Sequence, residues 1–357
     1  MPMPVIIKQD LELFSRTCLQ AAGCRPEDAA IVAEILVAAD LRAIYSHGVN
    51  RLEMYVHELR ARDVDPEATP AILTETTAVA CVDGNNGHGM VVGRFCMELA
   101  IRKAAEVGVG WVVARSSNHF GITGYYAMMA ADQGMIGLSF TNTSPLVVPT
   151  RATKPALGTN ALAAAAPARK DRFVLDMATS TVPIGKVEMQ HRKGEAVPPG
   201  WGVDAAGQPT TIPAEILDGG ALLPLGGGEE TAGYKGYGLA TLVEIFCGVL
   251  AGAAFGLDIP PWRKGRGGAA NLGQCFVAID PSRFGAGFED RLASYLHQLR
   301  SLPTIEGETE VLVPGDPEQR AHDRQIRSGI ELHPNVAKAL RSLATDLGVH
   351  PPTFQGE

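Results

Sequence analysis

Residues 78–178 alternate between short apolar runs and helical patterns, and this alternation limits the possible folds more than any other feature of the chain. The run AVACVDG (78–84) precedes an amphipathic segment (91–108) that stops at Gly108, and WVVAR (111–115) follows. Apolar, β-branched runs bounded by turn residues are typical of strands, and apolar residues at helical spacing are typical of helices. The order strand, helix, strand predicts an α/β sheet.

Other segments extend this pattern. Further strands are predicted at MIGLSFTN (135–142), ALAAAAP (161–167), RFVLDMA (172–178) and, buried and late in the chain, NLGQCFVAIDP (271–281). Helices are predicted at 26–45, 50–62, 125–133, 286–301 and 334–347. Residues 193–233 are rich in Gly and Pro and predict a long ordered loop with short elements, and the tail from Pro351 is predicted to be loose.

Composition excludes several classes of protein. Of the 357 residues, 46% are hydrophobic and 20% charged, which indicates a large packed core. The net charge of -8 argues against binding to nucleic acid, which requires clustered Lys and Arg. Six cysteines without a C-x-x-C pair, and a start without a signal peptide, indicate reduced thiols in a cytoplasmic protein.

The apolar segment 237–257 has about the length of a membrane span. Glu244 and several glycines interrupt it, so we expect instead a helix buried on most sides of a soluble fold, and no contact with a membrane. No histidine pair at i, i+4 and no H-E-x-x-H motif occurs, so no metal site is predicted.

The usual nucleotide-binding loops are missing. The one nominal G-x-G-x-x-G match, GRGGAA (265–270), precedes no convincing helix, and no G-x-x-x-x-G-K-[ST] motif is present. Any nucleotide is therefore expected to bind without either loop.

Two histidines stand in unusual surroundings. His47 lies between Ser46 and Gly48 at a break between two helices, and His119 ends a strand, at the edge where α/β sheets bind ligands. Each imidazole is a candidate for proton transfer, although a capping or packing role is the alternative, above all for His47. Arg51 follows His47 closely and can hold a carboxylate through two parallel hydrogen bonds.

Two further segments carry polar groups that could serve a ligand. Asp176 closes a strand before a small hydroxyl-rich loop, which either forms an Asx turn or hydrogen-bonds a ribose or amide. Lys235 stands between glycines at a predicted helix start, where an anion would be stabilised; a solvated turn lysine is the alternative.

The motifs SHGVNRL, SSNHFGITGYYAMMA, GTNALAAAAP, VLDMATS, GYKGYGLA and VLVPGDPE occur in this order. Together they resemble the malate/L-lactate dehydrogenase family that is unrelated to Rossmann-type enzymes, over roughly residues 5 to 350. The resemblance implies a non-Rossmann mixed-sheet nicotinamide-binding domain (76–317) and a mainly helical domain from residues 1–75, completed by 318–357. It also implies a homodimer.

The resemblance assigns roles to matching residues. His47, supported by Ser46, is the proton donor in some members, and the counterpart of His119 is the acid/base in others. Arg51 and Tyr55 are candidates for binding the substrate. The implied cofactor contacts are His119, Phe120, Gly121, Ile122, Thr123, Thr143, Asp176, Met177, Ala178, Thr179, Ser180, Tyr234, Lys235, Pro314, Gly315 and Asp316.

The sequence therefore predicts an oxidoreductase that transfers a hydride between NAD, with NADP as the alternative, and C2 of a small 2-oxo or 2-hydroxy acid. A cationic histidine is expected to stabilise negative charge on the substrate oxygen. The alternatives are a reductase of cyclic 2-imino acids, a catalytically silent binding paralogue, and a hydrolase built on Ser46 and His47. The hydrolase is disfavoured because adjacent side chains rarely face each other and no G-x-S-x-G motif is present.

Overall fold

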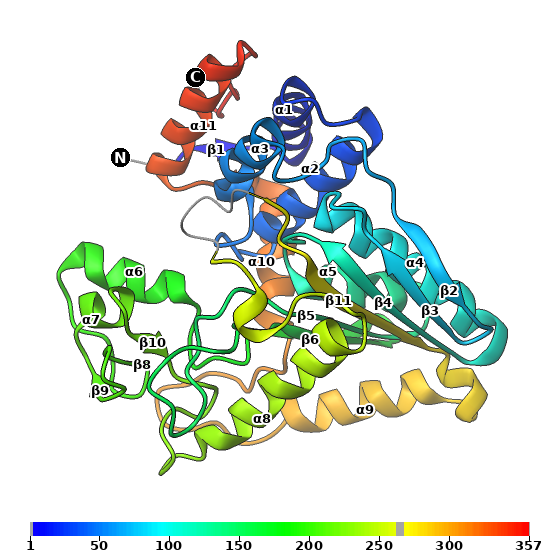
Figure 1. Ribbon diagram of the computed structural model, residues 1–357. Helices are drawn as coiled ribbons and strands as arrows, with labels where there is room; N and C mark the ends of the chain where they lie inside the picture. The colour runs from blue at the N-terminus through cyan, green and yellow to red at the C-terminus, as the bar shows by residue number, and fades with distance from the viewer. Residues whose placement is uncertain (1–2, 262–267, 357) are drawn as a thin grey trace.

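The computed structural model describes residues 3–261 and 268–356 and is built around a seven-stranded mixed sheet (Figure 1). Its order is β2-β3-β4-β11-β5-β6-β7. The strands are β2 (Ala71–Glu75), β3 (Val79–Asp83), β4 (Val109–Ser117), β5 (Ile136–Thr141), β6 (Leu162–Ala168), β7 (Asp171–Met177) and β11 (Leu272–Ile279). Only β3 and β4 pair in parallel within this sheet. The predicted α/β class with a non-Rossmann mixed sheet is confirmed.

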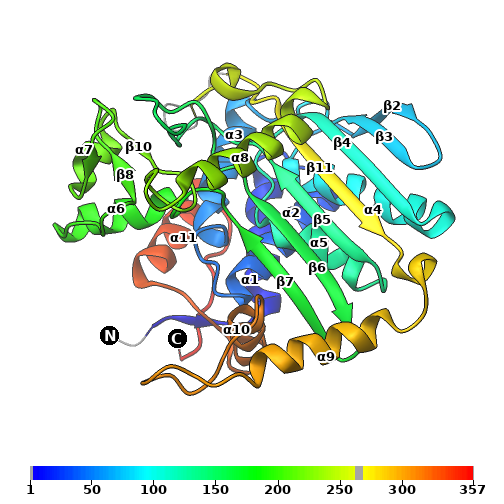
Figure 2. The same ribbon diagram turned by 90° about the horizontal axis from the view of Figure 1, so that it is seen from below.

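Strand β11 lies in the centre of the sheet although it comes late in the chain. Its side chains alternate, so that Phe276 and Ala278 join the core under the N-terminal helices while Cys275 and Val277 pack on the opposite face. Helices α4 (Gly89–Val107) and α5 (Thr123–Ala131) cover the first face. The π-helical turn Ile245–Val249, which continues α8 (Gly233–Glu244), covers the second (Figure 2).

The two ends of the chain meet in a helical layer beside the sheet (Figure 1). It contains α1 (Lys8–Ala21), α2 (Pro26–Leu41), α3 (Leu52–Ala61), α10 (Asp316–Ser328) and α11 (Pro334–Leu347). The short strand β1 (Val5–Ile6) pairs with β12 (Ile330–Glu331) and ties the N-terminus to the C-terminal segment. The predicted domain boundaries at residues 75 and 317 stay a prediction.

The Gly/Pro-rich segment is ordered, as predicted. After α6 (Ile184–Lys193) it forms the small sheet β10-β8-β9 and one short helix. Its elements are β8 (Gly202–Val203), β9 (Pro209–Thr210), α7 (Pro213–Leu217) and β10 (Ala221–Leu222). Helix α9 (Phe288–Arg300) runs below β6 and β7 (Figure 2).

Two expectations about packing are wrong. The segment 237–257 is not a helix buried on most sides, because α8 gives way to the π-helical turn and leaves Leu242, Val249 and Leu250 exposed. The C-terminal tail is not loose, because Phe354 is buried under the Arg341 guanidinium and the Gln355 N–H donates to the Val5 carbonyl. In both cases tertiary contacts that composition does not record decide the outcome.

Two further points concern segments without a clear signal. Helix α10 was not expected, because apart from Ala321 and Ile326 its side chains are almost all polar or charged and few of them are buried. The first half of the GRGGAA stretch (265–267) lies outside the described residues. Within the described ranges, no helix combines the length and apolar character that a membrane crossing requires.

Candidate active site

The turn that carries His47 is held by a buried carboxyl group. Asp40, at the end of α2, is 1% exposed and accepts a hydrogen bond of 2.8 Å from the Val49 N–H. A Cβ on Gly48 would stand 1.9 Å from Asp40 Oδ1, so only glycine fits beside the carboxyl group. The Ser-His-Gly motif is therefore shaped by Asp40, which places His47 at the helix junction.

The strand end that carries His119 is fixed by buried amides. Asn118 donates to the Gly87 carbonyl at 2.9 Å, and its own carbonyl accepts from Gln274 Nε2 at 3.0 Å. Ser117 Oγ donates to Gln274 Oε1 at 2.9 Å. These neighbours of His119 thus bind the surrounding backbone and the central strand. Buried polar groups need such partners, so the network holds the strand end in one conformation.

The structure brings the predicted proton-transfer and substrate residues together. The imidazole rings of His47 and His119 stack with centroids 5.6 Å apart and an interplanar angle of 18°. Ser46 Oγ lies 2.8 Å from His47 Nδ1, so the expectation that these adjacent side chains would not face each other is wrong. Arg51 Nε donates to the Ser46 carbonyl at 2.8 Å.

Tyr55 contacts His119 of this pair. Its side chain is 1% exposed, and its hydroxyl oxygen lies 2.5 Å from His119 Nδ1. His88 stands edge-on to the Tyr55 ring, with centroids 6.2 Å apart. The Tyr55 hydroxyl is thus engaged with His119 in this structure.

Both histidines of the pair are neutral at pH 7. Burial lowers the pKa of His47 to about 4, and the positive charge of Arg51 contributes. Burial lowers the pKa of His119 to about 3, with smaller contributions from His47 and Arg51. A cationic histidine, as predicted for the reacting site, is therefore not the resting state of the pair. Neutral imidazoles suit the acceptance of a proton from a substrate hydroxyl.

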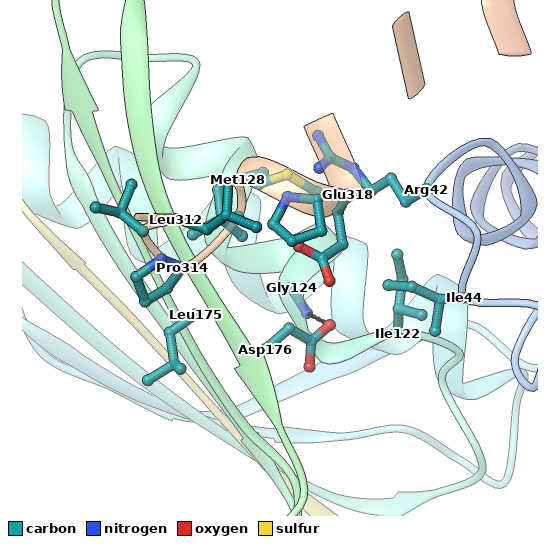
Figure 3. Close-up of a pocket in the computed structure, with 14 residues that line it drawn as sticks. Arg42, Ile44, Ile122, Gly124, Met128, Leu175, Asp176, Leu312, Pro314 and Glu318 are labelled. Carbon is teal, nitrogen blue, oxygen red and sulfur yellow. Dashed lines mark hydrogen bonds between the residues drawn. The ribbon is translucent and has the colours of Figure 1, made fainter. Parts of the chain in front are cut away.

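A cavity of about 350 Å³ is lined by residues from the segments next to His47 and His119, from β7 and from the stretch 312–318 (Figure 3). Ile44 and Ile122 belong to its wall, and so do Arg42 and Glu318. The volume falls within the range of small-molecule sites, about 300–1,000 Å³.

Asp176 lies in this cavity and caps a helix from a distance. Its Oδ2 accepts from the Gly124 N–H at 2.7 Å, near the start of α5 (Figure 3). A carboxylate is stabilised there by the unpaired N–H groups of the first turn. Burial nevertheless raises the pKa of Asp176 to about 7. The sequence predicted either an Asx turn or a ribose contact at this position. The structure shows a different role for Asp176, which is to hold α5 against β7.

Four of the predicted cofactor residues, from three separate motifs, converge on the cavity: Ile122, Asp176, Pro314 and Gly315. Phe120 and Gly121 are buried in the loop between His119 and α5, and Thr123 is buried at the first position of α5. Met177 and Ala178 are partly buried at the end of β7. Tyr234 and Lys235 are exposed on the first turn of α8 and form no hydrogen bond or ion pair with the histidine pair.

The remaining predicted cofactor side chains are already engaged within the described residues. Thr179 Oγ1 donates to the carbonyls of Thr159 and Asn160, and Ser180 Oγ donates to the Val182 carbonyl. Asp316 forms a two-pronged ion pair with Arg300, at 2.9 and 2.6 Å. What these residues offer a ligand in this conformation is their backbone.

Glu244 hydrogen-bonds groups from several loops. In the sequence it stood out only as a charge that interrupts an apolar run. Its Oε1 accepts from Asn142 Nδ2 at 3.2 Å and from the Gly256 N–H at 2.9 Å, and its Oε2 accepts from Asn160 Nδ2 at 2.6 Å. Asn160 Oδ1 in turn accepts from the Thr143 N–H at 3.1 Å. A lone carboxylate in an apolar run was the available signal for this role.

Metal ligation has no support in the described part of the chain, where no group of three or more His, Cys, Asp or Glu side chains is arranged to hold an ion.

Replacing Asp40 by Asn is expected to change how stability depends on pH. Burial raises the pKa of Asp40 to about 8, whereas the unfolded value is about 4. Between these values the folded state keeps a proton that the unfolded state has lost, so the free energy of unfolding falls as pH rises. Asp40→Asn keeps an oxygen for Val49 and removes this loss. Its stability relative to the wild type should rise by at least about 1 kcal/mol between about pH 5 and about pH 8 in urea unfolding.

The control is Asp346→Asn, at an exposed position on α11. It should show no such gain, because solvent surrounds this carboxylate in both states. A constant difference between Asp40→Asn and the wild type across this pH range would contradict a protonated, buried Asp40.

Glu244→Gln is expected to destabilise the protein. Three N–H donors surround the carboxylate, and the amide nitrogen of Gln would face at least one of them. An unsatisfied buried donor costs about 1–3 kcal/mol, which urea unfolding would detect. Glu98→Gln, which breaks an exposed pair with Arg94 on α4, should cost about 0–1 kcal/mol. Equal losses in the two variants would show that Glu244 does not hold the loops.

Comparison with known proteins gives consistent results. The family model described as malate/L-lactate dehydrogenase matches residues 6–341. A malate dehydrogenase of Pyrococcus horikoshii is 40% identical over 96% of this chain and 95% of its own length. An L-sulfolactate dehydrogenase of Methanocaldococcus jannaschii is 38% identical over 93% and 94%. The crystal structure of a Δ1-piperideine-2-carboxylate reductase from Pseudomonas syringae superposes with a TM-score of 0.85 at 32% identity, over 95% of this chain and 99% of that chain. The chain therefore belongs to the malate/L-lactate dehydrogenase family of oxidoreductases.

Proposed function

We propose that this protein is an NAD(P)-dependent dehydrogenase that acts on a small 2-hydroxy acid and, in reverse, on the corresponding 2-oxo acid. The observation that carries the proposal is the stacked pair His47 and His119 beside Arg51. An imidazole of this pair can exchange a proton with the C2 oxygen, and a guanidinium can bind the neighbouring carboxylate. The similarity to malate and sulfolactate dehydrogenases supports this substrate class.

The residues around the cavity fit part of a dinucleotide. Ile122 and Pro314 offer apolar surface, and Asp176 and Glu318 offer hydrogen-bond acceptors for hydroxyl groups. When bound, the nicotinamide would take or supply the hydride. The protein's own task is to hold the acid in line and to exclude water around the histidines.

Within this proposal, NAD is favoured over NADP. Carboxylates hydrogen-bond ribose hydroxyls and repel a 2′-phosphate. Glu318 lines the cavity, where Asp176 adds a second hydrogen-bonding oxygen, and Arg42 is the one positively charged residue in its wall. We also propose a cytoplasmic location, which the six free cysteines support, because five of them are buried as reduced thiols.

A reductase of cyclic 2-imino acids is the second candidate. Such a substrate carries the same carboxylate and an sp² C2, with C=N in place of C=O. The likeness to the Pseudomonas syringae reductase favours it. A silent paralogue that binds the cofactor without turnover is the remaining alternative.

The test of the proposed function follows the absorbance of NADH and NADPH separately with oxaloacetate, pyruvate, longer 2-oxo acids and Δ1-piperideine-2-carboxylate. Turnover of an open-chain 2-oxo acid, faster with NADH, is the expected result. Turnover of the cyclic imine alone would replace the substrate class. Binding of the cofactor with no turnover on any compound would favour the silent paralogue.

Arg51→Lys sharpens this test. Loss of the two-pronged grip should raise KM for the acid about tenfold, which corresponds to the loss of one charged hydrogen bond, and should leave KM for the cofactor unchanged. Arg60→Lys, at an exposed position on α3, is the matched control and should behave like the wild type. An unchanged KM for the acid in Arg51→Lys would remove Arg51 from the substrate site.

We also propose a homodimer. Leu242, Ile245, Val249 and Leu250 are 42–56% exposed and follow helical spacing, so they form one apolar surface. Leu250→Glu should convert a dimer into a monomer in sedimentation experiments at micromolar concentration. Leu13→Glu, at a position 52% exposed on α1, should remain a dimer. A monomeric wild type would contradict the proposal.

A further inference from the structure

Two hydrogen bonds converge on Nδ1 of His119. The Gly121 N–H points to this nitrogen at 3.4 Å, and the Tyr55 hydroxyl oxygen lies 2.5 Å from it. A backbone N–H can only donate, so Nδ1 must act as the acceptor. The Tyr55 hydroxyl then faces an accepting nitrogen and is the donor of the shorter bond.

The acceptor role of Nδ1 settles where the proton of His119 sits. A neutral imidazole carries one proton, and with a lone pair on Nδ1 this proton is on Nε2. The opposite tautomer would direct an Nδ1–H against the Gly121 N–H. His119 therefore presents an N–H group to a ligand and has no bare nitrogen with which to accept a proton.

His47 is held differently. Its Nδ1 has the Ser46 hydroxyl as its hydrogen-bond partner, at 2.8 Å. A hydroxyl can rotate to donate or to accept, so it is compatible with either tautomer and with the imidazolium. His47 can thus gain and lose a proton at Nε2 while the bond to Ser46 is kept.

We infer that Tyr55 and the Gly121 amide lock His119 as an Nε2–H donor to the substrate's C2 oxygen, so that His47 is the residue that takes and returns the proton. This inference rests on the proposed function and deepens it, because it divides the work between the two histidines. Tyr55 is a positioning residue that acts through His119. The two rings lie side by side, with centroids 5.6 Å apart, so they border the same space.

The step balances as an oxidation. The hydroxyl proton of the substrate moves to Nε2 of neutral His47, and the O–H electron pair forms the C2=O bond. The C2 hydride would pass to the oxidised nicotinamide when that cofactor is bound. The Nε2–H of His119 hydrogen-bonds the oxygen throughout and is not transferred. His47 then releases its proton to solvent, and reduction follows the same path in reverse.

The lock is tested by nitrogen NMR of protein labelled with ¹⁵N-histidine at neutral pH, with the His119 signals assigned from His119→Asn. The wild type should show a protonated Nε2 and an unprotonated Nδ1 at His119. Tyr55→Phe should give a mixture of the two tautomers, because only the long bond from Gly121 remains. A protonated Nδ1 in the wild type, or an unchanged spectrum in Tyr55→Phe, would overturn the inference.

Tyr126→Phe is the matched control. Tyr126 is also fully buried, and its hydroxyl donates to the Phe120 carbonyl at 2.5 Å, next to His119. Its loss should lower stability and leave the His119 tautomer unchanged. A tautomer shift in this control as large as in Tyr55→Phe would show that general loosening is the cause.

Activity tests the division of labour. Tyr55→Phe should lower kcat about tenfold without changing the Kd of the cofactor. His47→Gln should lower kcat about 10²–10⁴-fold, as expected for the loss of the proton acceptor. His119→Gln keeps an N–H group at the same reach and should retain clearly more activity than His119→Ala. Full turnover by His47→Gln would overturn the assignment.

The two proposals fail in different ways. The nitrogen spectrum is recorded without substrate, so it tests the lock whether or not the proposed reaction occurs. If no acid is turned over while His119 is found with a protonated Nε2, the lock stands and the proposed function falls. Turnover of an acid with His119 in the opposite tautomer would do the reverse.

Discussion

The insertion of β11 between β4 and β5 is the constraint on which the rest of the site depends. Gln274, fully buried at the start of β11, bonds Ser117 and Asn118 and so fixes the strand end that carries His119. On the other side, the Gly273 N–H donates to Asn142 Oδ1 at 2.9 Å. Asn142 leads to Glu244 and the loops that it gathers. One late strand therefore couples the histidine pair to the loops across the sheet.

Burial of titratable groups is the second common feature, and it acts in opposite directions. The pKa values of His47, His88 and His119 lie below the ordinary value, so the folded state binds fewer protons and loses stability as pH falls below about 6.5. Asp40 and Asp176 have raised pKa values and cost stability as pH rises toward 7 or 8. The site thus combines neutral imidazoles with carboxyl groups that keep protons, which limits the net charge in a buried region.

Much of the fold could be read from local pattern. The strands from β3 to β7 and β11 are apolar runs ended by turn residues, and burial on both faces of β11 produces its nearly continuous apolar sequence. Helix α10 was not predicted because few of its residues are buried and one of these, Gln325, is polar, so the apolar spacing typical of a helix is missing. The burial of segment 237–257 was predicted wrongly because an apolar composition does not reveal whether another element covers the segment.

By itself, the sequence determined the class of fold and the family, and it singled out candidate reactive residues, because these follow from residue types at short spacing. Ser46, His47, Arg51 and His119 are the candidates, and the structure places them close together. Only the tertiary structure decided how they are charged and which hydrogen-bond partners their ring nitrogens have. Those properties depend on groups distant in the chain, such as Tyr55 on α3 and Asp40 on α2, and on the loss of solvent around them. Electrostatic environment is a property of packed neighbours, and no local pattern contains it.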